Sequence, residues 1–381
     1  MDGASNEAGE RTGPSASKRE ADGIEVEPFE GLHGLKSQRG TWDELLANSH
    51  ADRAFNHFDW VLAHAQAFVP EQLFGWTLRQ GDRPVALFCL QKEKKRGVFA
   101  LRRALLAGDG SFDTDYGEPL IHTDHMSKAV GYLLQLAHKQ RGIDALVFSG
   151  LKNDAVFLSA LRTELAQRRL PYNEGPTSSL VLELPSSFEE YLSGLKSRMR
   201  SKVRKAVRDA QQLETSFSLC TSSDQLDQEL GTLFDLHAKR WQEVGQDGSF
   251  GDEKRRTFYR GMARSFLQRG GLRLTRLSHK ERTVAVQLGL VEGATYYQLQ
   301  EGYDPEYSSQ RVGVALRALS KEALIEEGIR RYDYLAGDSQ HKRDWGARPV
   351  PCTTLAFPTG GLRSRLSYRL RPLWNRLRSR S

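Results

Sequence analysis

Long apolar runs and cysteine pairs are scarce in this 381-residue chain. No segment approaches the roughly 18 consecutive apolar residues that a membrane-spanning helix needs, and the N-terminus lacks the apolar core of a secretory signal. The three cysteines, Cys89, Cys220 and Cys352, are odd in number and widely spaced. Neither a disulfide framework nor a zinc site is therefore expected. These absences predict a cytoplasmic protein with ordinary thiols.

Acidic residues also lack the pattern of a metal-binding loop. Residues 108–117 form a polar, glycine-rich segment that contains the pair Asp113 and Asp115. A calcium-binding EF-hand loop requires further acidic ligands and a closing Glu at set positions, and these are missing. We therefore predict no bound metal, and we expect this loop to lie on the surface or to line a substrate cleft.

Positive charge is concentrated in two segments. Residues 196–208 carry seven Lys or Arg and no acid, and residues 362–380 carry seven Arg and no acid. Without these fourteen charges the formal net charge of +7 would become −7. Basic segments of this kind commonly meet phosphates, anionic lipid or acidic glycans. The tail 361–381 is amphipathic, which fits a peripheral contact with an anionic membrane as well as a solvated basic tail packed loosely on the domain.

The hydrophobic pattern predicts an α/β protein with two lobes. Residues 1–22 contain almost nothing apolar and are expected to be a disordered leader. Strand and helix patterns alternate over residues 23–184 and again over 185–360, which predicts two mixed, largely antiparallel twisted sheets flanked by helices. We expect the lobes to join near Pro185, with the functional cleft between them. Residues 188–213 have the pattern of one long helix.

The stretch 296–345 carries the most informative pattern. Residues 295–301 alternate like a strand, a helix is predicted to begin near Val312 and to end at Gly328, and a second strand follows at Tyr332 and Tyr334. Between the first strand and the helix, small residues and free amides of the first helical turn are suited to a pyrophosphate. A glycine there also suits plain packing or capping. The residues of this loop are Gln310, Arg311, Val312, Gly313, Val314 and Ala315.

The loop resembles the pyrophosphate loop of GNAT acyltransferases, Q/R-x-x-G-x-G/A, through Gln310, Gly313 and Ala315. The following segment, YDYLAGDSQHKRDWG, resembles the FemAB-like and cellulose-biosynthesis (CelD-like) acetyltransferases, a branch related to GNAT. The family usually has Tyr where this chain has His341. The matching residues are Asp333, Gly337, Asp338, Lys342 and Trp345.

This resemblance implies two GNAT-like lobes, the first degenerate, and transfer of an acyl group from acyl-CoA to an amine or hydroxyl of a polysaccharide or cell-envelope precursor. Attack on a thioester needs a deprotonated nucleophile and a donor for the developing oxyanion, usually a backbone amide of the strand before the loop. Glu301, Asp338 and His341 are candidate bases. Lys342 is expected to neutralise substrate charge, with the acceptor lying toward it.

Two further functions stay open. A Fem-type transferase would use aminoacyl-tRNA as its donor, with the basic helix at 196–208 holding the RNA, although the long coiled-coil arm of many such enzymes has no counterpart here. A non-catalytic module that grips an anionic polymer is the third hypothesis. Apart from tRNA in the second hypothesis, nucleic acid is not an expected partner.

Overall fold

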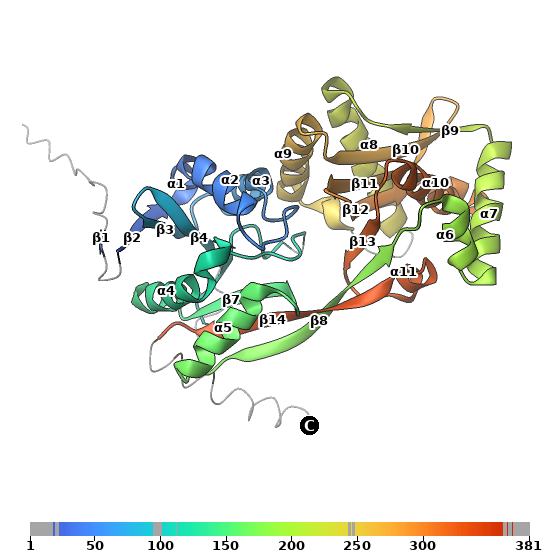
Figure 1. The fold of residues 1–381 in the computed structure, drawn as a ribbon. Helices are drawn as coiled ribbons and strands as arrows, with labels where there is room; N and C mark the ends of the chain where they lie inside the picture. Colours follow the sequence, from blue (N-terminus) through green and yellow to red (C-terminus); the bar gives the residue numbers. More distant parts are fainter. Residues whose placement is uncertain are drawn as a thin grey trace, which may run out of the picture.

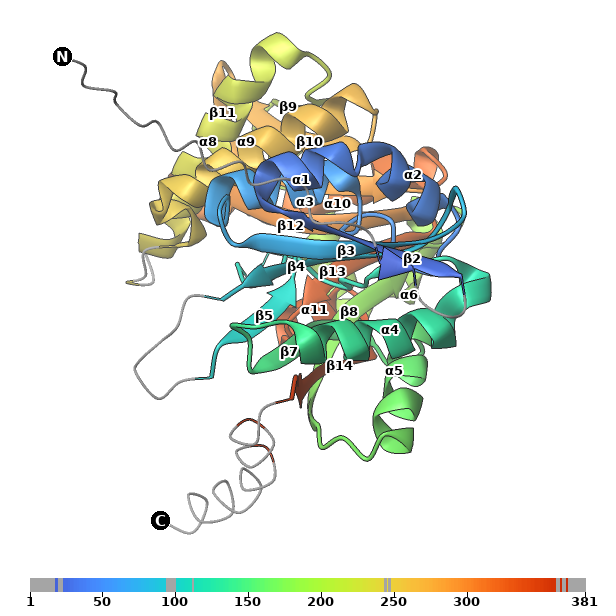
Figure 2. The ribbon, with the colours of Figure 1, turned by 90° about the vertical axis from the view of Figure 1, so that its left-hand side faces the viewer.

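The computed structural model describes residues 18–19, 23–93, 101–111, 113–242, 245, 248–360, 364 and 368. Within these residues the strands form one 14-stranded sheet, in the order β1-β2-β3-β4-β5-β7-β14-β8-β13-β12-β11-β10-β9, with β6 paired to β4. Helices cover both faces of this sheet (Figures 1 and 2). The predicted mixed α/β fold with two lobes is confirmed, but the two sheets that the sequence predicted are joined into one continuous sheet.

Helices of the first half lie on both faces of its part of the sheet (Figure 2). Side chains of β4 alternate accordingly: Leu87 and Cys89 share a core with the first three helices, whereas Phe88 and Leu90 share a core with the other two. The helices are α1 (Gly31–Ser37), α2 (Arg39–Ala47), α3 (Phe58–Phe68), α4 (Met126–Lys139) and α5 (Val156–Gln167). The strands are β1 (Lys18–Arg19), β2 (Ile24–Glu30), β3 (Leu73–Gln80), β4 (Arg83–Lys92), β5 (Arg103–Leu106), β6 (Leu120–Ile121), β7 (Ala145–Lys152) and β8 (Asn173–Glu183).

The second half contains the predicted antiparallel meander, which continues into a parallel pair of strands joined by a helix. Its strands are β9 (Thr215–Leu219), β10 (Leu272–His279), β11 (Arg282–Glu292), β12 (Thr295–Tyr303), β13 (Arg331–Ala336) and β14 (Arg348–Pro358). Its helices are α6 (Phe188–Gly194), α7 (Ser197–Gln212), α8 (Ser223–Gln242), α9 (Glu253–Gln268), α10 (Val312–Glu326) and α11 (Gln340–Asp344). Gly328 has φ +89, as expected for a left-handed cap after α10.

The two halves exchange strands. The strand β8 pairs with β13 on one side and with β14 on the other, and β14 also pairs with β7 of the first half. Figure 1 shows β8 and β14 running side by side across the molecule. Leu355 and Phe357 of β14 therefore lie in the core of the first half. A boundary near Pro185 divides the chain in sequence, but each half in space contains a strand from the other.

The prediction of one long helix over residues 188–213 is wrong, because this segment forms two helices, α6 and α7. Leu195 is extended (φ −74, ψ 151) and Lys196 precedes the first turn of α7 with φ −54 and ψ 140. The break turns Leu195 into the core that contains Trp345, and the hydroxyl of Tyr191 donates to the Trp345 carbonyl at 3.0 Å. A tertiary contact therefore overrides the local helical pattern.

Parts of the predicted leader and tail are described. Lys18 and Arg19 form β1 on the edge of β2, so the leader is not wholly disordered; its other residues lie outside the described residues. Ser364 and Tyr368 are buried, and the Ser364 hydroxyl donates to the Asp144 carbonyl. The start of the tail thus packs on the first half, and its remaining residues are outside the described part. None of the described helices is long and apolar enough to cross a membrane.

Candidate active site

The strands β12 and β13 part after three residue pairs. They are in parallel register only from the pair of Thr295 with Arg331 to the pair of Tyr297 with Asp333. Beyond this point no strand of the described part of the chain pairs with the edge of β12 that faced β13. A bulge in β12 opposite β11 also shifts the alternation of side chains. The parted strands therefore leave an opening in the middle of the second half.

The bulge places three side chains of β12 on two different faces. The amide of Gln298 donates to Glu301 at 3.0 Å, so these two side chains share the face covered by α10. The amide of Gln300 donates instead to the Tyr259 hydroxyl at 3.2 Å, on the face that meets the first half. Regular alternation would have put Gln298 and Gln300 on the same face.

A pocket of about 210 Å³ occupies the opening on the face that meets the first half. Both halves line it, so the predicted cleft between the lobes exists. Its lining residues are Asp113, Asp115, Tyr259, Gln298, Leu299, Gln300, Tyr334, Leu335, Ala336 and Lys342. The glycine-rich loop 108–117 thus lines a cleft, which was one of the two expectations from the sequence.

Asp115 is the carboxylate best suited to accept a proton in this pocket. Burial raises its pKa to about 6, and the nearby Asp333 adds to this effect, whereas the amide of Ala336 and the charge of Lys342 oppose it. The Ala336 amide lies 3.4 Å from the Asp115 carboxylate. A base with a pKa near the working pH is the most efficient kind. Sequence reasoning missed Asp115, although the Asp-x-Asp pair in a glycine-rich loop was the available signal.

Lys342 closes the end of β13. Its ammonium donates to the carbonyls of Tyr334 at 2.8 Å and Ala336 at 2.7 Å, and lies 3.3 Å from the Leu335 carbonyl. These carbonyls converge because Leu335 has φ +61, a strained conformation for a branched side chain. Burial lowers the pKa of Lys342. The hydrogens of the ammonium are committed to the backbone, so Lys342 shapes the pocket rather than offering free donors to a substrate.

Glu301 is the centre of a charged cluster on the other face of the opening. Its carboxylate accepts from Arg240 at 2.9 Å and from Nε of Arg317 at 2.6 Å, and a second Arg317 nitrogen also contacts it. Burial alone would raise the pKa of Glu301, but the charges and hydrogen bonds of these arginines outweigh burial and lower the pKa to about 2. A carboxylate held so firmly in its charged form is a poor proton acceptor at neutral pH.

The two other predicted bases lie outside the pocket lining. His341 contacts the Arg317 guanidinium, and burial together with the Arg317 charge lowers the pKa of His341 to about 4. Asp338 accepts from Arg343 at 2.7 Å on the surface, and this hydrogen bond lowers the pKa of Asp338. The structure therefore gathers Glu301 and His341 around one arginine and leaves Asp338 apart from them.

The predicted phosphate loop has fewer free amides than the sequence indicated. The amides of Val314 and Ala315 donate to the Arg311 carbonyl at 2.8 and 3.0 Å, and the Arg311 amide donates to Ser308 at 3.1 Å. Among the described residues, the amides of Val312 and Gly313 in the first turn of α10 have no protein acceptor. These two amides remain available for an anion at the start of α10.

The side chains around this loop pack rather than reach outward. Val312 and Ala315 are fully buried, and a Cβ at Gly313 would lie 3.1 Å from the Tyr303 ring. The Arg311 guanidinium pairs with Asp209 of α7 at 2.7 Å. Gln310 accepts a hydrogen bond from its neighbour, the Ser309 hydroxyl, at 2.8 Å.

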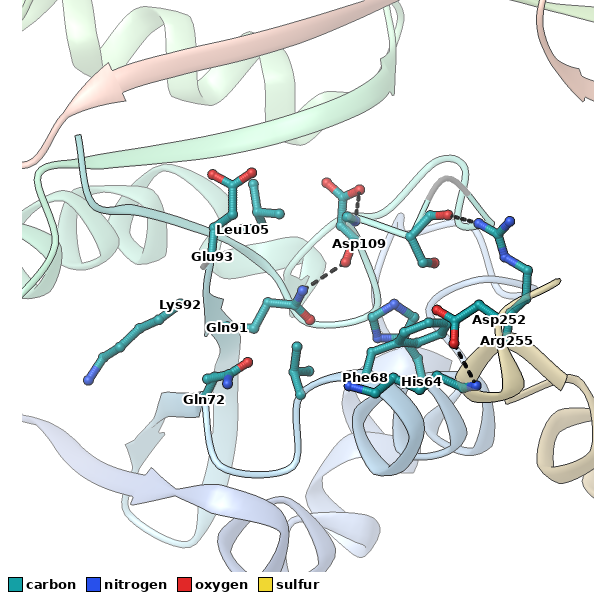
Figure 3. A pocket seen from close by; sticks show the side chains of 14 residues that line it. His64, Phe68, Gln72, Gln91, Lys92, Glu93, Leu105, Asp109, Asp252 and Arg255 are labelled. Carbon is teal, nitrogen blue, oxygen red and sulfur yellow. Dashed lines mark hydrogen bonds between the residues drawn. The ribbon is translucent and has the colours of Figure 1, made fainter. Parts of the chain in front are cut away.

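A second and larger pocket, of about 480 Å³, lies beside the first and is also built from both halves (Figure 3). Arg255 of α9 borders this pocket and donates a hydrogen bond to Asp113 at 3.0 Å. Asp113 in turn lines the small pocket. The buried ring of His64 lines the large pocket, and neither of its nitrogens has a hydrogen-bond partner among the described residues. The ring of Phe68 lies 4.8 Å from the His64 ring, and Gln72 lines another part of the pocket (Figure 3). A molecule larger than the small pocket thus has adjoining space.

The continuous sheet, the parted parallel strands and the pocket between the halves define a two-lobed α/β protein with a cleft between its lobes. Residues 197–343 match the family model described as an acetyltransferase (GNAT) domain. The second half of the chain is therefore similar to a GNAT-superfamily acetyltransferase domain. Comparison with curated proteins found no match.

Solved structures with the same fold cover most of this chain. FemX superposes with a TM-score of 0.57 at 12% identity, over 84% of this chain and 94% of its own. L-PGS from Bacillus licheniformis has a TM-score of 0.54 at 13% identity, over 90% and 98%. The C-terminal domain of a putative lysylphosphatidylglycerol synthetase from Agrobacterium fabrum has a TM-score of 0.53 at 9% identity, over 87% and 95%. At these identities the likeness establishes the shared fold.

Proposed function

We propose that this protein transfers an acyl group from acyl-CoA to an amine or hydroxyl of a polysaccharide or cell-envelope precursor, in the small pocket between the parted strands. The observation that carries the proposal is the position of Asp115. This carboxylate, with its pKa of about 6, reaches the opening of the GNAT domain from the other half of the molecule. We also propose that the protein is related to the CelD-like acetyltransferases that its sequence resembles.

The chemistry follows from the pocket. Asp115 accepts a proton from the acceptor amine or hydroxyl, whose lone pair attacks the thioester carbonyl; the new C–N or C–O bond forms and the C–S bond breaks to release the CoA thiolate. We assign the donor for the carbonyl oxygen, which gains charge in this step, to the backbone of β12 at Gln298–Gln300, beyond its last pair with β13. Lys342 holds the opposite wall in place.

The donor's diphosphate is assigned to the start of α10. The amides of Val312 and Gly313 have no protein acceptor there, and the Arg240 guanidinium lies 5.5 Å from the Tyr303 ring against which Gly313 packs. Two guanidiniums, of Arg240 and Arg317, share the single carboxylate of Glu301, so the cluster keeps a net positive charge. This charge favours an anionic donor.

The acceptor is assigned to the adjoining large pocket. Its carboxylates, carboxamides and rings provide both donors and acceptors next to an apolar surface, as a polyhydroxylated precursor requires. The lysylphosphatidylglycerol synthetase fold relatives are consistent with an acceptor from the cell envelope. Contact of residues 361–381 with an anionic membrane remains part of this proposal.

An aminoacyl-tRNA donor is the alternative, and the surface of α7 favours it. Arg204 pairs with Glu189, but no ion pair is present for the other exposed cations of this helix among the described residues. Such a face suits a polyphosphate backbone. The exposed cations at the start of and along α7 are Lys196, Arg198, Lys202, Lys205 and Arg208.

Calorimetry with acetyl-CoA and longer acyl-CoAs tests the donor directly. We expect binding to the wild-type chain and to a charge-reversal variant of α7, Lys205→Glu with Arg208→Glu, because the diphosphate site does not use these side chains. Binding of charged tRNA but of no CoA ester at millimolar concentration would transfer the proposal to the alternative donor. Mass spectrometry of copurifying ligands would then identify the acceptor.

A further inference from the structure

Lys321 is a fully buried lysine without a hydrogen-bond partner. It lies on α10 with 0% of its surface exposed, and its amino nitrogen contacts no acceptor among the described residues. Buried lysines are normally paired, since an isolated ammonium loses its hydration without compensation. Such a position is costly for stability and therefore calls for a functional explanation.

Three aromatic rings surround the amino group. It lies 3.8 Å from the centroid of Tyr332, 4.5 Å from that of Trp345 and 5.1 Å from that of Tyr334. The electron-rich faces of such rings attract a cation, most strongly where water is excluded. Burial, followed by the charge of Arg317, lowers the pKa of Lys321, whereas Glu301 raises it. The rings and Glu301 therefore oppose the loss of the proton.

This aromatic box connects the elements of the candidate site. Arg317, one turn earlier on α10, contacts Glu301 and His341. The Tyr332 hydroxyl donates to Gln298 at 2.8 Å, and Gln298 donates to Glu301. Trp345 directly follows α11, the helix of only five residues that carries Lys342. A helix this short is not stable by itself, so its placement depends on tertiary contacts such as this one.

We propose that Lys321 is a positioning residue for acyl transfer: its ammonium clamps Trp345 against β13 and thereby holds α11, with Lys342, at the wall of the small pocket. The inference rests on the proposed function for its effect on catalysis but not for the existence of the clamp. The charged groups that act on Lys321 are Arg317 and Glu301, and the phenols nearest to it are those of Tyr332 and Tyr334. Tyr296 and Tyr191 interact with these two tyrosines in turn.

The test is Lys321→Met, which keeps the length and apolar stem but removes the charge. We expect an unchanged or higher Tm, kcat at least tenfold lower, and an unchanged KM for acyl-CoA. In the wild type kcat falls as pH rises and Lys321 loses its proton; the variant lacks this dependence. The control is Glu326→Gln, on the exposed side of the same helix, with wild-type kinetics. A second variant, Trp345→Leu, lowers kcat similarly, and the double variant is no worse than either single one.

The contact between Lys321 and Trp345 can also be tested by a measurement that does not depend on enzyme activity. The indole N–H signal of Trp345 in an NMR spectrum, assigned with Trp345→Phe, shifts with pH in the wild type as Lys321 titrates and stays constant in Lys321→Met. Wild-type kcat in Lys321→Met, or an indole signal that ignores pH in the wild type, overturns the inference. If the wild type transfers no acyl group at all, the proposed function fails, and the indole titration alone then decides whether the clamp exists.

Discussion

Replacing Glu301 by glutamine separates two roles for this residue. As a catalytic base, Glu301 would be needed for rate and dispensable for folding. As the centre of the Arg240–Arg317 cluster, it is needed for folding, because the carboxylate is only 16% exposed and Arg317 only 9% exposed. The structure favours the second role, so we expect Glu301→Gln to act mainly on stability.

The magnitude follows from the pKa. A fall from 4.5 to about 2 corresponds to roughly 3 kcal/mol of stability at pH 7, since each pKa unit is worth about 1.4 kcal/mol. Removing one partner of a buried ion pair leaves the other charge uncompensated, which costs about 3–5 kcal/mol. Both routes give a loss of roughly 3–5 kcal/mol for Glu301→Gln at neutral pH.

The loss depends on pH with a definite sign. A carboxylate whose pKa is lowered by folding contributes fully above its unfolded pKa of about 4.5, and this contribution disappears as pH falls toward about 2. The pKa-linked part of the difference between wild type and Glu301→Gln is therefore expected to be clearly smaller at pH 3 than at pH 7.

Urea unfolding followed by circular dichroism at pH 7 and pH 3 measures this difference. The matched control is Asp338→Asn, which removes an exposed partner of Arg343 and should leave stability unchanged. A Glu301→Gln protein as stable as wild type at pH 7 but without transferase activity would refute the reasoning and restore Glu301 as a base.

Three other variants test the site and the fold. Asp115→Asn should lower transfer about 10²–10⁴-fold and abolish the rise of the rate through pH 6 that deprotonation of Asp115 produces, as a pH–rate profile would reveal. Phe357→Ala should lower the free energy of unfolding by about 3–5 kcal/mol, because Phe357 of β14 is buried in the core of the first half. Denaturant unfolding measures this loss, and a near-neutral effect would contradict the strand exchange. Gly313→Val should weaken acyl-CoA binding in calorimetry, since a side chain there meets Tyr303 and crowds the free amides, whereas Gly293→Ala, in an open turn, should bind normally.

Sequence patterns predicted the strands and helices correctly where residues close together in the chain determine the local structure. The strand at 295–301, the helix that Gly328 ends and the strand at 331–336 were predicted because their periodicity and their cap lie within a few residues. The break at Leu195 was missed because its cause, contact with the Trp345 region, lies about 150 residues away. Strand exchange was missed for the same reason, since the pattern of a buried strand does not specify its partner.

The site residues divide in the same way. Lys342 was identified from a motif, and the structure places it in the pocket wall. The altered pKa values of Asp115 and Glu301 arise from elements that fold together from distant parts of the chain, so spacing alone gave no indication of which carboxylate is buried and which is paired. Arg240 and Arg317, which settle the state of Glu301, belong to no motif in the sequence.

Strand exchange also bears on how the pocket works. A hinge near Pro185 would let two independent lobes close on their substrates, but here β8 and β14 lie next to each other across both halves. The helices α3 and α9 also share one core, where the rings of Trp60 and Phe258 lie 5.0 Å apart. Opening the lobes would expose this core and break sheet hydrogen bonds at the same time. The pocket is therefore preformed, and under the proposed function we expect selectivity for the acceptor to come from its fixed lining rather than from lobe closure.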